Sequence, residues 1–432
     1  MTGERRVASD RRSWLYVCAA VFAIAWGGNE FTPLLGMYRE ADGLSPVTVD
    51  VLLAVYVLGI VPAMIVGAPL SDRFGRRPVM LPAAFIGAAG SLVLAFAGGG
   101  APLLGVGRVL SGMALGLAMA VGTSWVKELS QAPYDAAAKP GGGAARGALS
   151  LTAGFLLGAA VAAPLAQWAP LPQTLPYLIS AALCLAGGCL AFAAPETRRS
   201  RGRASVGRLA RDLAVPAAGH RRFLFVVLPA VSWIFGSAAS AYAVLPALLT
   251  GRVTHDRLVF SGLLCAVTLG AAFAVQPLAR RFYSDRSARG VLIALGVTVV
   301  GMLGAAVAAS ALSPLLAIAA ALVLGIANGL LLLSTMLEVQ RIARDDDLAG
   351  LTALLYAGAY VGFFIPTLLG VLSGWVSYPV MFVGGAVIAS GCFALVLRYS
   401  TSYLHRHRGA ADASSGDGHH GDTRPLDLAL SK

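Results

Sequence analysis

The sequence predicts an all-α membrane protein with twelve transmembrane helices, arranged as two pseudo-symmetric bundles of six. Three observations lead to this fold class: the apolar composition, the long apolar runs and a repeat between the two halves of the chain. Hydrophobic residues make up 57% of the 432 residues and charged residues only 12%, whereas a soluble domain has about 25% charged residues. One soluble core cannot hide so much apolar surface, so the lipid bilayer is the predicted solvent.

The apolar runs give the number and the limits of the predicted helices. Roughly 20 apolar residues cross a bilayer, and the chain offers twelve such runs. They lie at 14–38, 46–70, 78–98, 102–125, 145–168, 174–194, 222–249, 257–279, 289–310, 314–337, 349–372 and 376–398. The predicted organisation is an N-terminal segment 1–13, a bundle 14–194, a basic linker 195–221, a second bundle 222–398 and a polar tail 399–432.

The positive charge is distributed as a topology signal. Most Arg and Lys residues fall in the two terminal segments and in alternate connections, above all in the linker ETRRSRGRASVGRLARDLAVPAAGHRR, while the other connections are nearly neutral. Cytoplasmic loops carry such an excess of Arg and Lys. We therefore expect both termini in the cytoplasm and no nucleic-acid site behind the formal charge of +12. The richness in Ala, Gly and Arg suggests a bacterium, so the expected location is a bacterial plasma membrane.

Four matches relate the two halves of the chain. APLSDRF at 68–74 corresponds to QPLARRF at 276–282, and RVLSGMALG at 108–116 corresponds to ALVLGIANG at 321–329. The Gly154-x-x-x-Gly158 pattern recurs from Gly358 to Gly362, and Trp26 has a counterpart in Trp233. Repeats of this kind build many transporter folds, so the matches indicate an ancient duplication of a six-helix unit.

The strongest local motif is GAPLSDRFGRRP at 67–78, which follows the second predicted span. Gly67 permits close helix approach, Asp72 can cap a helix or pair with Arg, and Gly75 allows a tight turn. The stretch resembles the loop signature of the major facilitator superfamily. That resemblance implies a gate motif that pairs the two halves while the protein is open outward, formed here by Gly67, Asp72, Arg73, Gly75, Arg76 and Arg77, with Glu128 as a further partner. The alternative is a topology determinant plus a turn.

Two charged residues fall inside predicted spans. Glu30 follows Asn29 in the stretch WGGNEFTPLL, and Arg108 precedes Gly112 and Gly116 on the fourth span. Ionisable residues in a membrane are costly and often functional. At about 1.5 Å per residue, Glu30 and Arg108 lie at comparable depth, so they can interact. Burial disfavours the charged form of a carboxyl group and a neighbouring cation favours it, which suits a group that exchanges a proton. A structural salt bridge and a snorkelling arginine are the alternatives.

Both stretches also carry a resemblance. The Arg108-x-x-x-Gly112 arrangement resembles the fourth-helix motif of proton-coupled members of the superfamily, in which this arginine faces the central cavity. NEFTPLLGMY resembles the first helix of the twelve-span drug/proton antiporter branch, where an acidic residue serves coupling. The resemblance implies that helices 1 and 4 line the N-terminal half of the cavity. The chain departs from the antiporter motif on the fifth span, where Ala159 stands in place of the expected proline.

The remaining candidates are small residues for helix packing and polar or aromatic residues for a cavity. Glycines four residues apart share one helix face and allow close contact; these are Gly112, Gly116, Gly154 and Gly158. Candidate cavity-lining residues are Trp26, Trp233, Ser237, Asn328, Tyr356, Tyr360 and Phe363. The last three aromatic residues fall on one helix face that suits an apolar or aromatic ligand, although such stripes also serve packing.

The sequence contains no pattern typical of an enzyme. It has no phosphate-binding Walker loop and no His-rich metal site, and its five Cys residues all fall in apolar runs. We expect a monomeric secondary transporter that needs no cofactor besides the proton gradient. The preferred expectation is proton-coupled efflux of a lipophilic or cationic small molecule by alternating access. Import of a metabolite by a proton symporter or facilitator is the alternative, and a receptor-like or scaffold protein is a more distant one.

Overall fold

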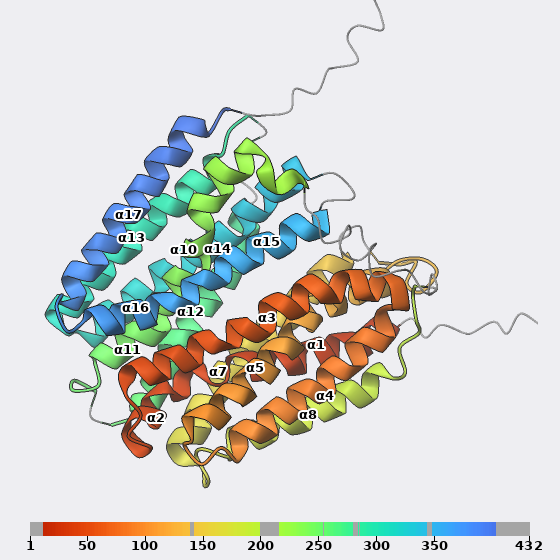
Figure 1. The fold of residues 1–432 in the computed structure, drawn as a ribbon, viewed down its shortest axis with the longest axis horizontal. Coiled ribbons are helices and arrows are strands. Elements are labelled where there is room, and N and C mark those ends of the chain that lie inside the picture. Colours follow the sequence, from red (N-terminus) through yellow and green to blue (C-terminus); the bar gives the residue numbers. More distant parts are fainter. Residues whose placement is uncertain are drawn as a thin grey trace, which may run out of the picture.

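The structure is a computed structural model, and it describes residues 12–138, 142–198, 216–253, 255–279, 284, 286–343 and 348–402. Every regular element in these residues is helical (Figure 1). Ten helices, some made of consecutive shorter elements, are long and apolar enough to cross a membrane. The two other predicted spans correspond to the shorter apolar helix α8 and to a run of helices from Ser13 to Ala41. The all-α membrane fold class is therefore confirmed.

The N-terminal bundle contains the first six predicted spans. Its first span is α1 (Ser13–Asn29), η1 (Thr32–Leu34) and α2 (Leu35–Ala41), and its fourth is α5 (Ala101–Leu117), η2 (Ala118–Gly122) and α6 (Thr123–Leu129). The other four are α3 (Pro46–Phe74), α4 (Arg76–Ala95), α7 (Gly142–Trp168) and α8 (Leu175–Ala191). The first span is broken where the sequence predicts one helix, because Pro33 has no N–H for the carbonyl of Asn29.

The C-terminal bundle repeats this organisation. Its first span consists of η4 (Phe223–Val227), α10 (Leu228–Ala239), η5 (Ser240–Val244) and α11 (Leu245–Leu248), preceded by η3 (Pro216–Gly219). The fifth consists of α15 (Leu348–Tyr360), η7 (Val361–Phe364) and α16 (Ile365–Leu372). The others are α12 (Arg257–Ala279), α13 (Arg289–Ala311), α14 (Pro314–Ile342) and α17 (Tyr378–Tyr399). Most of the predicted linker, the extreme N-terminus and the tail after 402 lie outside the described residues.

Local sequence explains where several helices begin. The side chain of Ser45 accepts a hydrogen bond from the Thr48 amide at 3.1 Å, and Pro46 occupies the first helical position of α3. Ser313 and Pro314 repeat the arrangement at the start of α14. Ser at the N-cap satisfies an amide that has no helical partner, and Pro at the next position has no amide to satisfy.

Glycine contacts repeat between the halves and support the predicted duplication. A Cβ on Gly112 or Gly116 of α5 would collide with backbone carbonyls of α3, and a Cβ on Gly325 or Gly329 of α14 would collide with backbone carbonyls of α12. Gly158 lies in the same way against the backbone of α1 at Trp26. These pairs of helices approach so closely because no side chain separates their backbones.

The two bundles have separate apolar cores that meet along one interface. The larger core is formed by the N-terminal bundle and includes Tyr242, Cys265, Tyr360 and Phe363 of the C-terminal half. We call the end of the molecule where α3 meets α4 and where α14 and α17 end the basic end, after its arginines. The opposite end, where α2 meets α3 and α11 precedes α12, is called the neutral end (Figure 1).

Candidate functional site

Glu30 lies where α1 ends, and its side chain is completely buried inside the N-terminal bundle. Neither carboxylate oxygen has a hydrogen-bond partner within the described part of the chain. The hydroxyls of Ser91 on α4 and Ser180 on α8 are 3.0 Å apart. A Cβ on Gly27 would lie 2.6 Å from the Ser180 Oγ, 3.5 Å from the Ser91 Oγ and 3.9 Å from Glu30 Oε1. These groups therefore share one small buried volume.

The direction of Glu30 differs from the expectation. The resemblance implies a side chain that faces a cavity shared by both halves, whereas Glu30 faces α4 and α8 inside its own bundle. Glu30 continues the helical geometry of α1, with φ of −62° and ψ of −28° and its amide donating to the Trp26 carbonyl, so its direction follows from how α1 is rotated in the bundle. Residue spacing gives the depth of a side chain in the membrane but not this rotation.

Arg108 is also buried, with 1% of its surface exposed. Its Nε donates to the Leu52 carbonyl at 3.3 Å and its Nη2 to the Leu53 carbonyl at 3.5 Å, both on α3. The guanidinium carbon lies 4.0 Å from the ring centre of Tyr56 and 4.7 Å from that of Phe31, which are cation–π distances. Nη1 has no hydrogen-bond partner among the described residues. The site therefore leaves one guanidinium nitrogen unpaired.

The two charges belong to one buried group but form no salt bridge with each other in the described structure. Phe31, the neighbour of Glu30 in sequence, lies against Arg108 and also stacks on Tyr38 with ring centres 5.1 Å apart. The hydroxyls of Tyr38 and Tyr177 are 2.6 Å apart. We call the following residues the Glu30 cluster: Glu30, Tyr38, Ser91, Arg108, Tyr177 and Ser180. Indirect contact therefore replaces the direct pairing that the sequence suggested.

Asn29 faces the opposite way from Glu30 and reaches the other half of the molecule. Its Nδ2 donates to the Phe155 carbonyl on α7 at 3.1 Å and lies 3.5 Å from the sulfur of Cys265 on α12. Its Oδ1 accepts from Thr32 at 3.0 Å. Two consecutive residues thus connect the interface between the bundles with the interior of the N-terminal bundle.

An aromatic surface of the C-terminal half lies at this interface. The ring of Phe235 on α10 is 4.7 Å from that of Tyr360 and 5.3 Å from that of Phe363. The hydroxyl of Tyr360 donates to the sulfur of Met119 in the N-terminal half at 3.3 Å. Tyr356, one turn earlier, packs against both cores. Sequence reasoning missed Phe235, although it follows Trp233 by two residues in the same span.

The other predicted lining residues lie mainly within the bundles. Trp233 faces α13 and α17, since a Cβ on Gly385 would lie 3.7 Å from its ring and 3.5 Å from the sulfur of Met302. Ser237 donates to the Ile234 carbonyl of its own helix at 3.1 Å, and Asn328 of α14 donates to the same carbonyl. Trp26 is buried, and its ring lies 6.0 Å from that of Phe22. The structure thus gives Trp26 and Trp233 packing contacts, and Ser237 and Asn328 hydrogen bonds within their own half.

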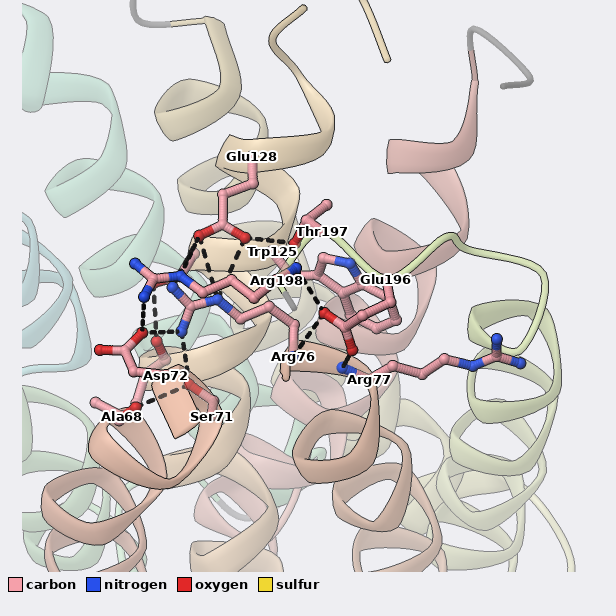
Figure 2. A network of polar contacts seen from close by, with 12 residues as sticks. Ala68, Ser71, Asp72, Arg76, Arg77, Trp125, Glu128, Glu196, Thr197 and Arg198 are labelled. Carbon is pink, nitrogen blue, oxygen red and sulfur yellow. Dashed lines mark hydrogen bonds and ion pairs between the residues drawn. The ribbon is translucent and has the colours of Figure 1, made fainter. Parts of the chain in front are cut away.

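The motif at 67–78 forms a charged network at the basic end (Figure 2). The Arg76 guanidinium lies 2.9 Å from Asp72, 2.8 Å from Glu128 and 2.6 Å from the Ser71 hydroxyl. Gly67 lets α3 approach α5, because its Cβ would lie 2.7 Å from Leu117. Arg73 lies in the last turn of α3. Every partner of Arg76 among the described residues belongs to the N-terminal half, so Arg76 makes no polar contact with the other bundle in this part of the chain.

The segment after α8 completes this network, and the sequence analysis did not identify it. The Glu196 carboxylate accepts hydrogen bonds from the backbone amides of Arg76 at 2.9 Å and Arg77 at 2.8 Å. These two bonds cap the start of α4. Arg198 lies 3.2 Å from Asp72 and 3.6 Å from Glu128, and Thr197 donates to Glu128. Glu196 therefore caps the helix, a role considered for Asp72. The signal in the sequence that could have identified this segment is the run of an acidic, a hydroxyl and a basic residue directly after the predicted span 174–194.

The C-terminal half has a corresponding ion group at the basic end. Arg222 is completely buried and lies 2.7 Å from Glu338, which also lies 3.1 Å from Arg341. The Nη1 of Arg222 donates to the carbonyls of Ser400 and Ser402 at 3.2 and 2.8 Å. Glu338 is therefore buried between two arginines.

Polar contacts between the two halves occur at the centre and at the neutral end of the described structure. Arg257 of α12 lies 2.7 Å from Glu40 of α2. The side chain of Gln167 on α7 accepts a hydrogen bond from the backbone amide of Leu258 on α12 at 3.1 Å. Arg39 lies 2.7 Å from Asp50, and a Cβ on Gly370 would lie 3.1 Å from the other oxygen of Asp50. The bundles are therefore joined toward the neutral end.

This geometry agrees with the family comparison. Residues 15–365 match the Major Facilitator Superfamily, and the chain belongs to this family of secondary transporters. A comparison with curated protein sequences gives no significant match.

Several solved transporter structures have the same fold. A POT family transporter in complex with 5-aminolevulinic acid has a TM-score of 0.71 and 13% identity, covering 90% of this chain and 96% of that one. A nucleoside transporter has a TM-score of 0.67 and 13% identity, covering 90% and 100%. A D-xylose-proton symporter has a TM-score of 0.63 and 16% identity, covering 87% and 96%. At these identities the similarity shows the fold alone.

Proposed function

We propose that the protein is a proton-coupled exporter of lipophilic or cationic small molecules, similar in mechanism to the drug/proton antiporter branch of its superfamily. Glu30 binds and releases the coupled proton. The observation that carries this proposal is a completely buried carboxylate with no hydrogen-bond partner in the described residues. Such a group changes its charge when its surroundings change, because burial and a nearby cation act on its charged form in opposite directions.

The Glu30 cluster and the interface are joined through the first span. Asn29 contacts α7 and α12, Glu30 faces α4 and α8, and Phe31 contacts Arg108. Glu30 is bonded directly to Asn29, which contacts the other half of the molecule through α12. A change in the charge of Glu30 therefore acts on the interface between the two halves. We infer that protonation shifts the balance between states closed at one end or the other by this route.

The substrate class is supported by the aromatic surface at the interface. Phe235, Tyr360 and Phe363 pack against one another at the interface, with Tyr360 and Phe363 buried, and separation of the two halves would expose rings that suit apolar ligands and cations. A lipophilic molecule crosses the bilayer without a protein, so an energy-coupled protein changes its distribution mainly by pumping it outward. A lipophilic substrate therefore favours export.

The charge distribution supports the proposed direction and location. Arg and Lys gather at the basic end, which we assign to the cytoplasm of a bacterium. The cross-half polar contacts of the described residues then correspond to closure toward the outside. In the opposite state we expect the Arg76 network to contact the C-terminal half and close the cytoplasmic side. One chain supplies both bundles, so we expect a monomer.

The alternative function is import of a small polar metabolite by proton symport or facilitated diffusion. The observation that favours it is one buried amide in each half: Asn29 at the end of α1, and Asn328 of α14 beside α10. Amides of this kind bind polar groups of a substrate. The two functions differ in the direction of the proton gradient that drives accumulation.

The test uses purified protein in liposomes and ethidium as a lipophilic cationic probe, with the membrane potential held at zero by valinomycin and equal K⁺. Antiport predicts accumulation of ethidium in vesicles that are acidic inside, because protons leave as the probe enters. Accumulation only in vesicles placed in an acidic medium would establish symport instead. Ethidium accumulation under neither gradient would contradict the proposed substrate class.

A further inference from the structure

An apolar groove lies on the surface of the N-terminal bundle, outside the transport path proposed above. It runs along α4 and ends near the last turn of α8. Phe85 is 38% exposed and Phe192 is 47% exposed, and their rings lie 6.2 Å apart. The groove is lined by Pro78, Leu81, Pro82, Phe85, Ile86, Ala89 and Phe192.

The groove faces the bilayer. Pro78, Pro82, Phe85 and Ala89 recur at helical spacing and are exposed, whereas Val79 and the other face of α4 are buried in the bundle. α4 is one of the helices long and apolar enough to cross a membrane. Because this surface is apolar and faces the bilayer, lipid acyl chains are in contact with it.

A guanidinium lies at the basic end of this groove. The Nη2 of Arg77 donates to the Phe192 carbonyl at 2.7 Å, and its guanidinium carbon lies 5.8 Å from the Phe192 ring centre. Figure 2 shows the Arg77 side chain directed away from the Arg76 network. No carboxylate forms a salt bridge with the Arg77 guanidinium in the described structure. The nearby Glu196 carboxylate accepts a hydrogen bond from the backbone amide of Arg77 and not from its side chain. Most of the five guanidinium donors therefore remain available.

We propose that Arg77 and this groove bind one anionic phospholipid. The phosphate pairs with the Arg77 guanidinium, which matches phosphate geometry, and one acyl chain lies along the groove over Phe85 and Phe192. The combination fits a lipid because its headgroup site carries an unneutralised positive charge and its tail site is apolar. Arginines at this end of a span attract the anionic lipids of the cytoplasmic leaflet.

The bound lipid would also act on the charged network. Arg77 connects the start of α4 to the end of α8, and the segment that follows α8 carries Glu196 and Arg198. A phosphate on Arg77 adds a fixed contact at this connection. We therefore expect a bound anionic lipid to raise the thermal stability of the protein.

The test is native mass spectrometry of the delipidated full-length protein, titrated with phosphatidylglycerol or with phosphatidylcholine of identical acyl chains. The wild type is expected to retain one phosphatidylglycerol at concentrations where phosphatidylcholine is lost. Arg77→Gln should weaken this binding about tenfold, as expected for loss of a charge-assisted hydrogen bond. Arg398→Gln is the matched control, because Arg398 is exposed at the same end and lies 5.8 Å from an aromatic ring.

A second variant tests the groove separately from the charge. Ala89→Trp fills the groove and leaves Arg77 in place, so it should also weaken phosphatidylglycerol binding.

Equal binding of the two lipids, or equal losses in Arg77→Gln and Arg398→Gln, would overturn the proposal. Displacement of the lipid by inorganic phosphate at equal concentration would show that the groove contributes nothing. Formation of a dimer through this face would show that a second copy of the protein, and not a lipid, occupies the groove, which would also overturn the proposal. None of these outcomes depends on transport activity.

Discussion

Gly75 shows how two separate demands fix one residue type. Its backbone has φ of +104° and ψ of 163°, a conformation essentially restricted to glycine. A Cβ there would also lie 2.6 Å from the Glu196 carboxylate that caps α4. The motif itself predicts the tight turn, because its spacing is local. The contact with Glu196 involves a residue 121 positions away and could not be predicted from spacing.

Replacement of Gly75 should therefore cost more than replacement of another glycine with positive φ. We expect Gly75→Ala to destabilise the protein by about 1–3 kcal/mol through backbone strain. Gly98→Ala is the control, since Gly98 has φ of +56° with no atom within 4 Å of its Cβ position, and its expected cost is about 1 kcal/mol. Thermal unfolding in detergent gives the comparison. Equal losses would contradict the extra cost that the Gly75 backbone conformation and its contact with Glu196 together impose.

Glu30 marks the limit of sequence reasoning for a single residue. Its apolar surroundings in the sequence indicate a buried carboxylate, and the helical rise gives its depth near Arg108. Which helices it faces depends on the rotation of α1 in the bundle and on the small volume beside Gly27. The same holds for Trp233, whose position in the sequence matches that of Trp26 but whose ring packs among α10, α13 and α17. Composition and spacing carry no information about such rotations.

At the scale of elements, the helices and their close contacts could be predicted well. The long apolar runs correspond to the described spans, and the small-residue patterns fall where backbones touch. Breaks inside spans could not be predicted with the same success. The π-helical segments η4 and η5 each end two residues before a proline, Pro229 and Pro246, which has no N–H for the carbonyl four residues earlier. No proline follows η2 in this way, so that irregularity follows from packing rather than from local sequence.

The ion group that holds the C-terminal bundle should be important for stability. Glu338→Gln leaves the completely buried Arg222 without its anionic partner, and loss of one member of a buried pair costs about 3–5 kcal/mol. Glu40→Gln is the control, because the Glu40–Arg257 pair is exposed and such pairs contribute about 0–1 kcal/mol. The apparent melting temperature should fall much further for the first variant. A similar fall in both would contradict a structural role for the buried group.

Two segments far apart in the sequence also meet at the start of α4. Glu196→Ala removes the side chain that accepts the amides of Arg76 and Arg77, and loss of a helix cap costs about 1 kcal/mol. Arg252→Gln, an exposed substitution at the neutral end, should change stability by less than about 0.5 kcal/mol. Thermal unfolding of both variants separates the two cases. An unchanged melting temperature in Glu196→Ala would contradict the capping role.

For the whole molecule, the sequence predicts two related bundles but not how they meet. The duplication and the number of apolar runs define the architecture, and the family comparison agrees with it. The contacts at the neutral end join side chains from segments such as α2 and α12, which are more than 200 residues apart. No local pattern identifies such a pair. The arrangement also belongs to one state of a molecule that we expect to alternate between two.

A crosslink across the neutral end should stop this alternation. We expect a short bis-maleimide to abolish transport in a Glu40→Cys/Arg257→Cys variant, because these positions belong to different halves. The matched control is Asp42→Cys/Gln173→Cys, whose native side chains lie 3.0 Å apart at the same end but within one half. Transport should survive crosslinking of the control pair. Transport that also survives in the first variant would exclude the rocking of one half against the other.

The most direct measurement of the central claim compares two transport modes of Glu30→Gln in liposomes. The probe is ethidium, and Asp256→Asn, which alters an exposed carboxylate at the neutral end, is the control. Because Glu30 faces away from the interface, we predict that Glu30→Gln still exchanges labelled for unlabelled ethidium at equal pH but no longer accumulates it in vesicles that are acidic inside. Asp256→Asn should do both. Accumulation driven by the proton gradient at the wild-type level in Glu30→Gln would contradict the claim that Glu30 carries the proton.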